Sequence, residues 1–459
     1  MRSRLTAPNH RGLHQQGVRP RPRRTASAAF VAALALAGTA ACAGGGSTAT
    51  ASATSASPLP TVTGPVTITF DEAMSSGTQK STLDKLVSQF EATNPNITVK
   101  LSASANYGVL LTKEKAEVAA GSAPTIAQVY ESWAADYANS QVITPISDLA
   151  GTSSPTQLSS FYTGVRKDLY LPDGKLWEWP FNKSLQVLFY NQDLLTAKGL
   201  STPTTWDQFA TTLKAATGNG VTGISIDPGG VSGVTSGEEM LEEIAASNGA
   251  TLYGTGGTPK FTSAGAVAAL QYLVDLKSAK ALVTGTNYPG ETALGNKTGL
   301  ADISSSAGYY YENQAVGGKF KLTTTGLPAG SAGSVDMMAG TNLVVFSAAT
   351  AQQKAAAWTF MQYLTTAPAQ AQWAAATGYL PVTAQALTDP AMSSYLAGNP
   401  WVSAVIPSLN TAITDPPYTW VTKCGTYLSA AIQAGLSGTS AASAMGTAQT
   451  ACTAAKANS

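Results

Sequence analysis

Strand and helix patterns alternate along the body of the chain, and this alternation constrains the fold more than any other feature. Alternating apolar residues predict a strand at 66–70, and the next segment carries an apolar helical face that ends before Pro95. The order then repeats, with a strand at 97–101, a helix at 110–120 and a strand at 125–130. Because strands joined by helices pair in parallel, we predict an α/β fold with a largely parallel first sheet.

The pattern breaks at 177–181 and then resumes without a clear linker between domains. Further strands are predicted at 185–190 and 221–226, and long helices at 262–279 and 352–364. We therefore predict two α/β lobes joined by several crossings of the chain, with a cleft between them. The predicted first lobe comprises 64–184 and about 298–348, and the predicted second lobe comprises 185–297 and 349–459.

Polar and aromatic residues follow the predicted parallel strands. In open parallel sheets, ligands bind beyond the carboxyl ends of the strands. This rule places Asp71, Tyr107, Glu131 and Trp133 at the ligand edge.

The N-terminal segment has the composition of an export signal. Seven arginines lie in the first 24 residues, and an apolar run at 28–37 leads through small residues to Cys42. The segment resembles a bacterial lipoprotein signal, so we expect removal of 1–41 and lipidation of Cys42. The alternative is ordinary cleavage nearby. The charge-free segment 42–63 is expected to be a flexible tether.

The basic residues are unevenly distributed. The chain has 27 Lys and Arg against 26 Asp and Glu, but without the seven N-terminal arginines 20 basic residues face 26 acidic ones, a net charge of −6. A nucleic-acid-binding protein needs a basic face on its folded part. The sequence therefore disfavours nucleic-acid binding.

Both histidines, His10 and His14, lie in the predicted signal. Removal of the signal excludes Ser-His-Asp and Cys-His catalysis and histidine-ligated zinc, and we expect neither metal nor cofactor. Cys424 and Cys452 are predicted to form a disulfide in an oxidising compartment, the alternative being two buried thiols.

One dense acidic cluster stands on a predicted helix, at Glu238, Glu239, Glu242 and Glu243. Two carboxylates are sufficient for glycoside hydrolysis, so a secreted hydrolase is the alternative from another functional class. The i, i+4 spacing beside apolar residues favours a solvated helix face instead.

Several segments together resemble one family, the extracellular solute-binding proteins of bacterial ABC importers, in the branch for sugars and glycerol phosphates. They lie in matching order from about residue 66 to the end, and they read SQFEATNPNITVKL, GSAPTIAQVYESW, PFNKSLQVLFYNQDLL, TPTTWDQF, AGTNLVVFSAATAQQKAAAWTFMQYLTT and TGYLPVT. The resemblance implies a two-lobed, periplasmic-binding-protein-like fold of type II.

The resemblance also implies a set of ligand contacts. The family pattern puts them on Tyr107, Glu131, Ser184, Ser306, Gly340 and Tyr379. Two departures count against glycerol phosphate as the ligand. Asp71 replaces a tryptophan, and the arginine that would hold the phosphate falls near Gly425, with only Lys423 close by. A neutral ligand rich in hydroxyl groups fits better, with Asp71 and Trp133 as further contacts.

The resemblance implies binding without chemistry. The lobes would close on a carbohydrate, and the closed monomer would deliver it to the permease subunits in the membrane. The lipid on Cys42 would hold the protein at the extracellular face of the cell membrane. The other alternative is an adhesion or sensor lipoprotein with the same fold, which would bind a protein partner.

Overall fold

The computed structural model describes residues 59–229 and 236–459. The predicted signal, Cys42 and most of the predicted tether lie outside the described residues. The last five tether residues, 59–63, are described, and they do not match the prediction of a free linker. Leu59 and Val62 pack against the apolar core, and the carbonyl of Thr61 accepts a hydrogen bond from Gln352 at 3.3 Å.

The first lobe is built on parallel strands, as the sequence predicted. Its strands are β1 (Val66–Glu72), β2 (Ile97–Ala103), β3 (Ile126–Val129), β4 (Ile143–Thr144) and β12 (Met338–Phe346). β1 pairs in parallel with β2 and β3, while β12 runs antiparallel to β3 and β4. The helices of this lobe are α1 (Gly77–Thr93), α2 (Tyr107–Ala119), α3 (Glu131–Asn139), α4 (Ile146–Ala150), α5 (Thr163–Lys167), α12 (Ala351–Leu364), α13 (Ala367–Thr377), α14 (Pro390–Gly398) and α15 (Pro400–Val405).

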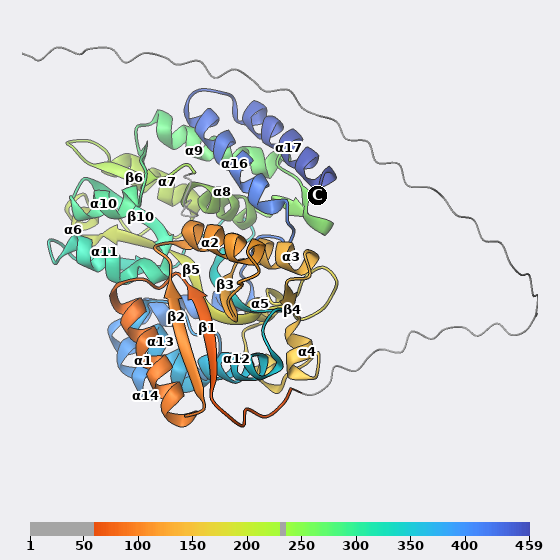
Figure 1. The fold of residues 1–459 in the computed structure, drawn as a ribbon. Helices are drawn as coiled ribbons and strands as arrows, with labels where there is room; N and C mark the ends of the chain where they lie inside the picture. Colours follow the sequence, from red (N-terminus) through yellow and green to blue (C-terminus); the bar gives the residue numbers. More distant parts are fainter. Residues whose placement is uncertain (1–58, 230–235) are drawn as a thin grey trace, which may run out of the picture. The chain divides into compact units, whose positions relative to one another are not determined.

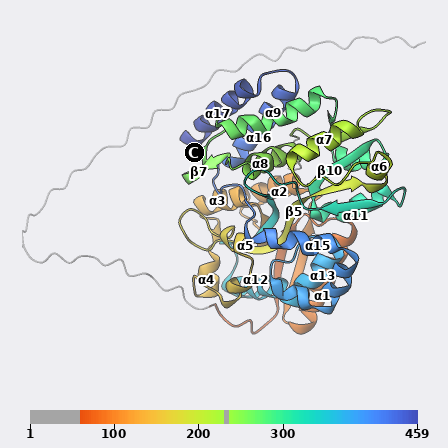
Figure 2. The same cartoon turned by 180° about the vertical axis from the view of Figure 1, so that it is seen from behind.

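The second lobe has its own strands and helices. Its strands are β6 (Thr222–Ile226), β7 (Tyr253–Gly254), β8 (Thr258–Pro259), β9 (Leu282–Thr284), β10 (Gly299–Ser305) and β11 (Leu322–Thr325). Its helices are α6 (Gln192–Ala197), α7 (Trp206–Ala216), α8 (Ser236–Ser247), α9 (Ala264–Ser278), α10 (Pro289–Gly295), α11 (Tyr309–Val316), α16 (Val421–Leu436) and α17 (Ala441–Ala457). In Figures 1 and 2, α9, α16 and α17 lie together at one end of the described chain, and α1, α12 and α13 lie toward the other.

One long strand, β5 (Trp179–Asn191), joins the two lobes. Its first half pairs with β12 from Trp179 to Leu185, and its second half pairs with β10 and β11 from Gln186 to Asn191. All 13 residues are buried. The strand is covered on both faces although it contains polar residues, and it begins at Trp179, where the sequence predicted a break at 177–181.

The apolar cores correct the predicted lobe boundaries in two places. The predicted first lobe included 298–348, and Val316 and the strand β12 do belong to the first core. However, β10 pairs with β6, and its Leu300 belongs to the second core. The predicted second lobe began again at 349, but α12–α15 pack in the first core through residues such as Phe360 and Val402. Only the end of the chain, α16 and α17, returns to the second core. Strand and helix periodicity does not report which core an element joins, which explains both errors.

Cys424 of α16 and Cys452 of α17 form a disulfide, as the sequence predicted. Their Cα atoms are 4.9 Å apart, and the bond closes a loop with a sequence separation of 28. Replacing both cysteines with alanine is expected to lower the free energy of unfolding by about 3 kcal/mol, because the unfolded chain regains the entropy of the open loop. Urea unfolding of both proteins, with and without reductant, measures this difference. The variant should not respond to reductant, and an unchanged midpoint in the variant would contradict the prediction.

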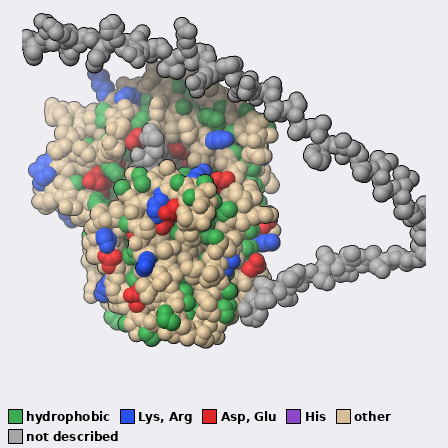
Figure 3. All heavy atoms as spheres, viewed as in Figure 1, with side chains coloured by type: hydrophobic (Ala, Val, Ile, Leu, Met, Phe, Trp, Pro, Cys, Tyr) green, Lys and Arg blue, Asp and Glu red, His purple; other side chains and the backbone are tan. Residues whose placement is uncertain are grey.

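No helix among the described residues is long and apolar enough to cross a membrane. The surface shown in Figure 3 is mostly uncharged, and its Lys, Arg, Asp and Glu side chains lie singly or in small groups. The described residues on this face form no broad basic patch.

Candidate functional site

A cavity of about 420 Å³ lies where the two lobes meet, and residues from both lobes line it. The first lobe contributes the segments that follow β1 and β2, together with Tyr130 after β3. The second lobe contributes Glu239 of α8, the N-terminal end of α10 and the last residues of β10. A cleft of this size with mixed aromatic and polar lining is typical of a small-molecule site.

Two of the predicted contacts, Tyr107 and Tyr379, lie side by side in the cavity. Their hydroxyl oxygens are 3.2 Å apart, and Asn182 Nδ2 donates to the Tyr107 hydroxyl at 3.1 Å. Tyr107 begins α2 directly after Asn106, whose side chain caps that helix by accepting from the Val109 N–H at 2.9 Å. Hydrogen-bonded phenols have fixed orientations, so both rings are held in place before a ligand arrives.

Two further predicted contacts, Ser184 and Gly340, come from the central strands β5 and β12 and also line the cavity. Gly340 has a φ of +93°, and a Cβ atom there would lie 1.7 Å from the carbonyl oxygen of Asn182. The fold itself therefore requires glycine at this position. That these four residues contact a ligand remains a prediction.

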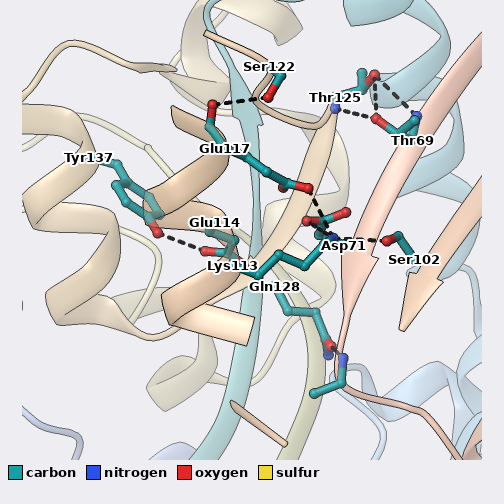
Figure 4. Close-up of polar contacts among 11 residues, drawn as sticks. Thr69, Asp71, Ser102, Lys113, Glu114, Glu117, Ser122, Thr125, Gln128 and Tyr137 are labelled. Atoms are coloured by element: carbon teal, nitrogen blue, oxygen red, sulfur yellow. Dashed lines mark hydrogen bonds and ion pairs between the residues drawn. The ribbon is translucent and has the colours of Figure 1, made fainter. Parts of the chain in front are cut away.

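Asp71, a predicted contact, does not line the cavity. It is 2% exposed and forms an ion pair with Lys113 of α2, which also donates to Ser102 Oγ at 2.8 Å (Figure 4). The cavity is lined instead by Ala73 and Met74, which lie beyond the end of β1 at Glu72. The carboxylate at the end of β1 therefore holds α2 against the sheet.

Glu131, another predicted contact, lies outside the cavity in a buried charged cluster. Its Oε1 is 3.6 Å from Lys183 Nζ, and Asp168 Oδ2 lies 2.6 Å from the same nitrogen. Asn342 Nδ2 completes the cluster by donating to Asp168 Oδ2 at 2.9 Å and to Glu178 Oε2 at 3.0 Å. Burial and the neighbouring Asp168 raise the pKa of Glu131 well above its usual range. Glu131 is thus one of the carboxyl groups around a fully buried lysine, and not part of the cavity wall.

The last two predicted contacts, Trp133 and Ser306, are also buried away from the cavity. Trp133 packs edge-on against Tyr130, with ring centroids 5.2 Å apart, in a small core beneath α3. Ser306 is fully buried, while its neighbours Ser305 and Ala307 line the cavity. A one-residue difference of this kind cannot be read from sequence, because it depends on how the chain turns at the end of β10.

The cavity also contains residues that the sequence analysis did not select. Tyr130, Gln186, Glu239 and Tyr288 all line it. Tyr130 follows a predicted parallel strand, so the strand-end rule could have included it. Glu239 stood out in the sequence only as part of the acidic cluster, and nothing in the local pattern singles out Gln186 or Tyr288. The helix α8 and the loop before α10 reach the cavity only through the packing of the second lobe.

The acidic helix α8 is not a solvated face, so that prediction is wrong. Glu242 is 7% exposed and Glu243 is fully buried, where it accepts from the Met337 N–H at 3.2 Å. Glu239 lines the cavity and accepts from Gln186 Nε2 at 2.8 Å. Burial, followed by Glu238 and Asp415, raises the pKa of Glu239 to about 8.

The described residues contain no group of three or more His, Cys, Asp or Glu side chains placed to hold a metal ion. The acids that line the cavity place carboxyl oxygens at its wall. Such acceptors suit hydroxyl, amine or ammonium donors on an organic ligand.

A sequence model of the family described as bacterial extracellular solute-binding protein matches residues 85–398, more than half of the chain. Among curated proteins, the sn-glycerol-3-phosphate-binding periplasmic protein UgpB of Escherichia coli (strain K12) is 33% identical over 151 residues. The match covers 31% of this chain and 34% of that protein, so the chain spans about a third of the length of this relative.

Solved structures are similar over a much larger part of the chain. The GacH receptor of Streptomyces glaucescens, solved unliganded and with acarbose, has a TM-score of 0.72 and 22% identity, covering 85% of this chain and 98% of that one. UgpB from Mycobacterium tuberculosis in complex with glycerophosphocholine has a TM-score of 0.75 and 18% identity, with coverages of 86% and 99%. The cyclic alpha-maltosyl-1,6-maltose binding protein of Arthrobacter globiformis has a TM-score of 0.74 and 21% identity, with coverages of 86% and 100%. At these identities the likeness confirms the predicted two-lobed fold class.

Proposed function

The chain belongs to the bacterial extracellular solute-binding proteins, and from this premise we propose that it captures a carbohydrate in the cavity between its lobes for delivery to an ABC permease. Members of this family bind solutes for transport and are not enzymes, so the two-carboxylate hydrolase is set aside. The proposal concerns the class of ligand and the residues that hold it.

The observation that carries the proposal is the chemistry of the cavity wall. Its described residues include tyrosines, serines, amides and carboxyl groups, but no Lys, Arg or His. Hydroxyl groups of a sugar can donate to carboxylate and amide oxygens, and tyrosine rings can cover the apolar face of the sugar. The predicted contacts Tyr107, Ser184, Gly340 and Tyr379 belong to this wall.

A glycerol-phosphate ligand is the second candidate. The specific observation in its favour is the 33% identity to the glycerol-3-phosphate-binding protein of Escherichia coli. Electrostatics count against this ligand, because a buried phosphate needs a guanidinium or ammonium partner. Lys423 is exposed on α16 and does not line the cavity, and Gly425 packs against Glu238.

We place the capture step in a closing motion of the two lobes. Ligand contacts to both walls would draw the lobes together about β5, the strand they share. Ser132 of α3 and Thr422 of α16 already meet across the two lobes, with hydroxyl oxygens 2.9 Å apart. Removal of 1–41 and lipidation of Cys42 would then keep the closed protein close to its permease.

Binding assays test the proposal directly. Calorimetric titration with mono- and oligosaccharides, polyols and glycerol 3-phosphate should identify a carbohydrate ligand. Tyr288→Ala is expected to weaken its binding about tenfold, because a stacked ring contributes about 1 kcal/mol or more. Tyr288 is 50% exposed, so the variant should keep its melting temperature.

Val109→Ala is the matched control, since Val109 is 49% exposed and does not line the cavity. It should bind the carbohydrate as the wild type does. Tight binding of glycerol 3-phosphate, with no carbohydrate bound, would overturn the proposed ligand class. Equal affinity of the Tyr288→Ala variant would remove this ring from the site.

A further inference from the structure

The cavity wall combines acidic groups with aromatic rings, and its described lining residues include no Lys, Arg or His. Its carboxyl groups are Asp227, Glu239, Glu291 and Asp302. Its phenol rings are Tyr107, Tyr130, Tyr288, Tyr311 and Tyr379. A wall for neutral sugars alone needs hydroxyl partners, whereas this wall also concentrates carboxyl groups and the negative faces of aromatic rings.

Glu239 and Gln186 are hydrogen-bonded to each other, and one buried oxygen of this pair has no hydrogen-bond donor among the described residues. Gln186 Nε2 donates to Glu239 Oε2 at 2.8 Å, which fixes both side chains. Gln186 is 3% exposed and lines the cavity, and its Oε1 has no hydrogen-bond partner among the described residues. A buried acceptor without a donor is costly, so a donor from the ligand would lower the free energy of the complex.

Three of the carboxyl groups of the wall have no ion-pair partner within the described part of the chain. None of the ion pairs found there involves Glu239, Glu291 or Asp302. Burial, followed by Glu238 and Asp415, raises the pKa of Glu239 to about 8, and burial raises the pKa of Asp302 to about 7. These raised pKa values give both carboxyl groups a large protonated fraction near neutral pH, and a cation bound beside them would lower the pKa values and favour the charged carboxylates.

The tyrosines come from both lobes. Tyr107, Tyr130 and Tyr379 belong to the first lobe, and the Tyr107–Tyr379 hydroxyl contact of 3.2 Å fixes two of their rings. Tyr288 precedes α10 in the second lobe, and both it and Asn287 have left-handed backbones, with φ of +58° and +57°. Two consecutive left-handed residues other than glycine are strained, and strain of this kind is concentrated at ligand sites.

We propose that the solute captured in this cavity is a hydroxylated cation, with a protonated amine or a quaternary ammonium group held by Glu239, Gln186 and the tyrosines. This inference rests on the proposed function, because it assigns the charge of the ligand that the same cavity takes. An amino sugar and an ammonium ester of a polyol share this chemistry. In either case the hydroxyl groups meet the amide and serine side chains, and the cationic nitrogen meets the carboxylate and the rings.

Matched pairs of ligands test the proposal. Calorimetric titration compares glucosamine with glucose, their β-1,4-linked disaccharides with each other, and glycerophosphocholine with glycerophosphoglycerol, which has the same phosphodiester without the ammonium group. The ammonium-bearing member of at least one pair is expected to bind about 30-fold more tightly, since a desolvated cation gains from both the rings and the carboxylate. A preference within the sugar pairs would indicate an amino sugar, and a preference within the glycerophospho pair would indicate an ammonium ester of a polyol.

Glu239→Gln removes the charge and keeps an acceptor for Gln186. It is expected to reduce the preference for the ammonium-bearing ligand to about threefold or less. Asp207→Asn, an exposed change of the same kind on α7, is the control and should keep the full preference. Melting temperatures of both variants show whether they fold.

The outcomes separate this inference from the proposed function. Equal binding of neutral and cationic sugars, or no binding of any cationic probe, overturns the cation assignment. Neutral sugars that still bind would leave the proposed function standing. Tight binding of glycerol 3-phosphate with no preference for a cation overturns both.

Discussion

Lys183→Met is expected to lower the free energy of unfolding by about 3–5 kcal/mol, because it leaves buried carboxyl groups without their cation. Lys183 is fully buried on β5, and its Nζ lies 2.6 Å from Asp168 and 3.6 Å from Glu131. Burial alone would lower the pKa of Lys183, but Asp168 and Glu131 outweigh burial and raise it. The lysine is therefore charged in the folded protein. Its loss leaves the buried Asp168 carboxylate without its ion-pair partner.

Urea unfolding of the variant and the wild type measures this effect. Lys85→Met, an exposed change on α1, is the control and should alter the free energy of unfolding by less than about 0.5 kcal/mol. Adding Asp168→Asn to Lys183→Met should restore part of the loss, because the uncompensated charge is removed. A loss below about 1 kcal/mol for Lys183→Met would show that this buried cluster does not stabilise the fold.

Gly340→Ala is expected to destabilise the protein by about 4 kcal/mol, from backbone strain and steric overlap together. The φ of +93° disfavours any residue with a Cβ atom, and the new atom would lie 1.7 Å from the Asn182 carbonyl oxygen. β12 would then separate from β5 next to the register shift between Thr341 and Asn342. Because Gly340 also lines the cavity, we expect ligand binding to be lost as well.

Gly333→Ala separates the two causes. Gly333 has a φ of +103°, but a Cβ atom there would have no neighbour within 4 Å. This variant should lose only about 1 kcal/mol, the cost of the left-handed backbone alone. Chemical unfolding and calorimetric titration of both variants measure the difference. Equal losses would mean that contact with β5 does not require the glycine.

The sequence by itself determined the features that depend on neighbouring residues. The apolar periods of 66–70 and 97–101 predicted β1 and β2, and the order of strands and helices predicted their parallel pairing. The spacing and the oxidising compartment predicted the Cys424–Cys452 bond. Each of these features follows from the local chain and from the chemistry of its residues.

The tertiary structure alone decided where the charged side chains lie. Asp71 and Glu131 follow parallel strands, yet the folded chain pairs them with Lys113 and Lys183 outside the cavity. Glu239 has the pattern of a solvated helix, yet the packing of α8 brings it to the cavity wall. The face on which a side chain emerges depends on strand register and on which helix covers it, and distant parts of the chain fix both. Local periodicity therefore predicted the elements of the fold, while contacts between distant segments placed the acids and tyrosines around the cavity.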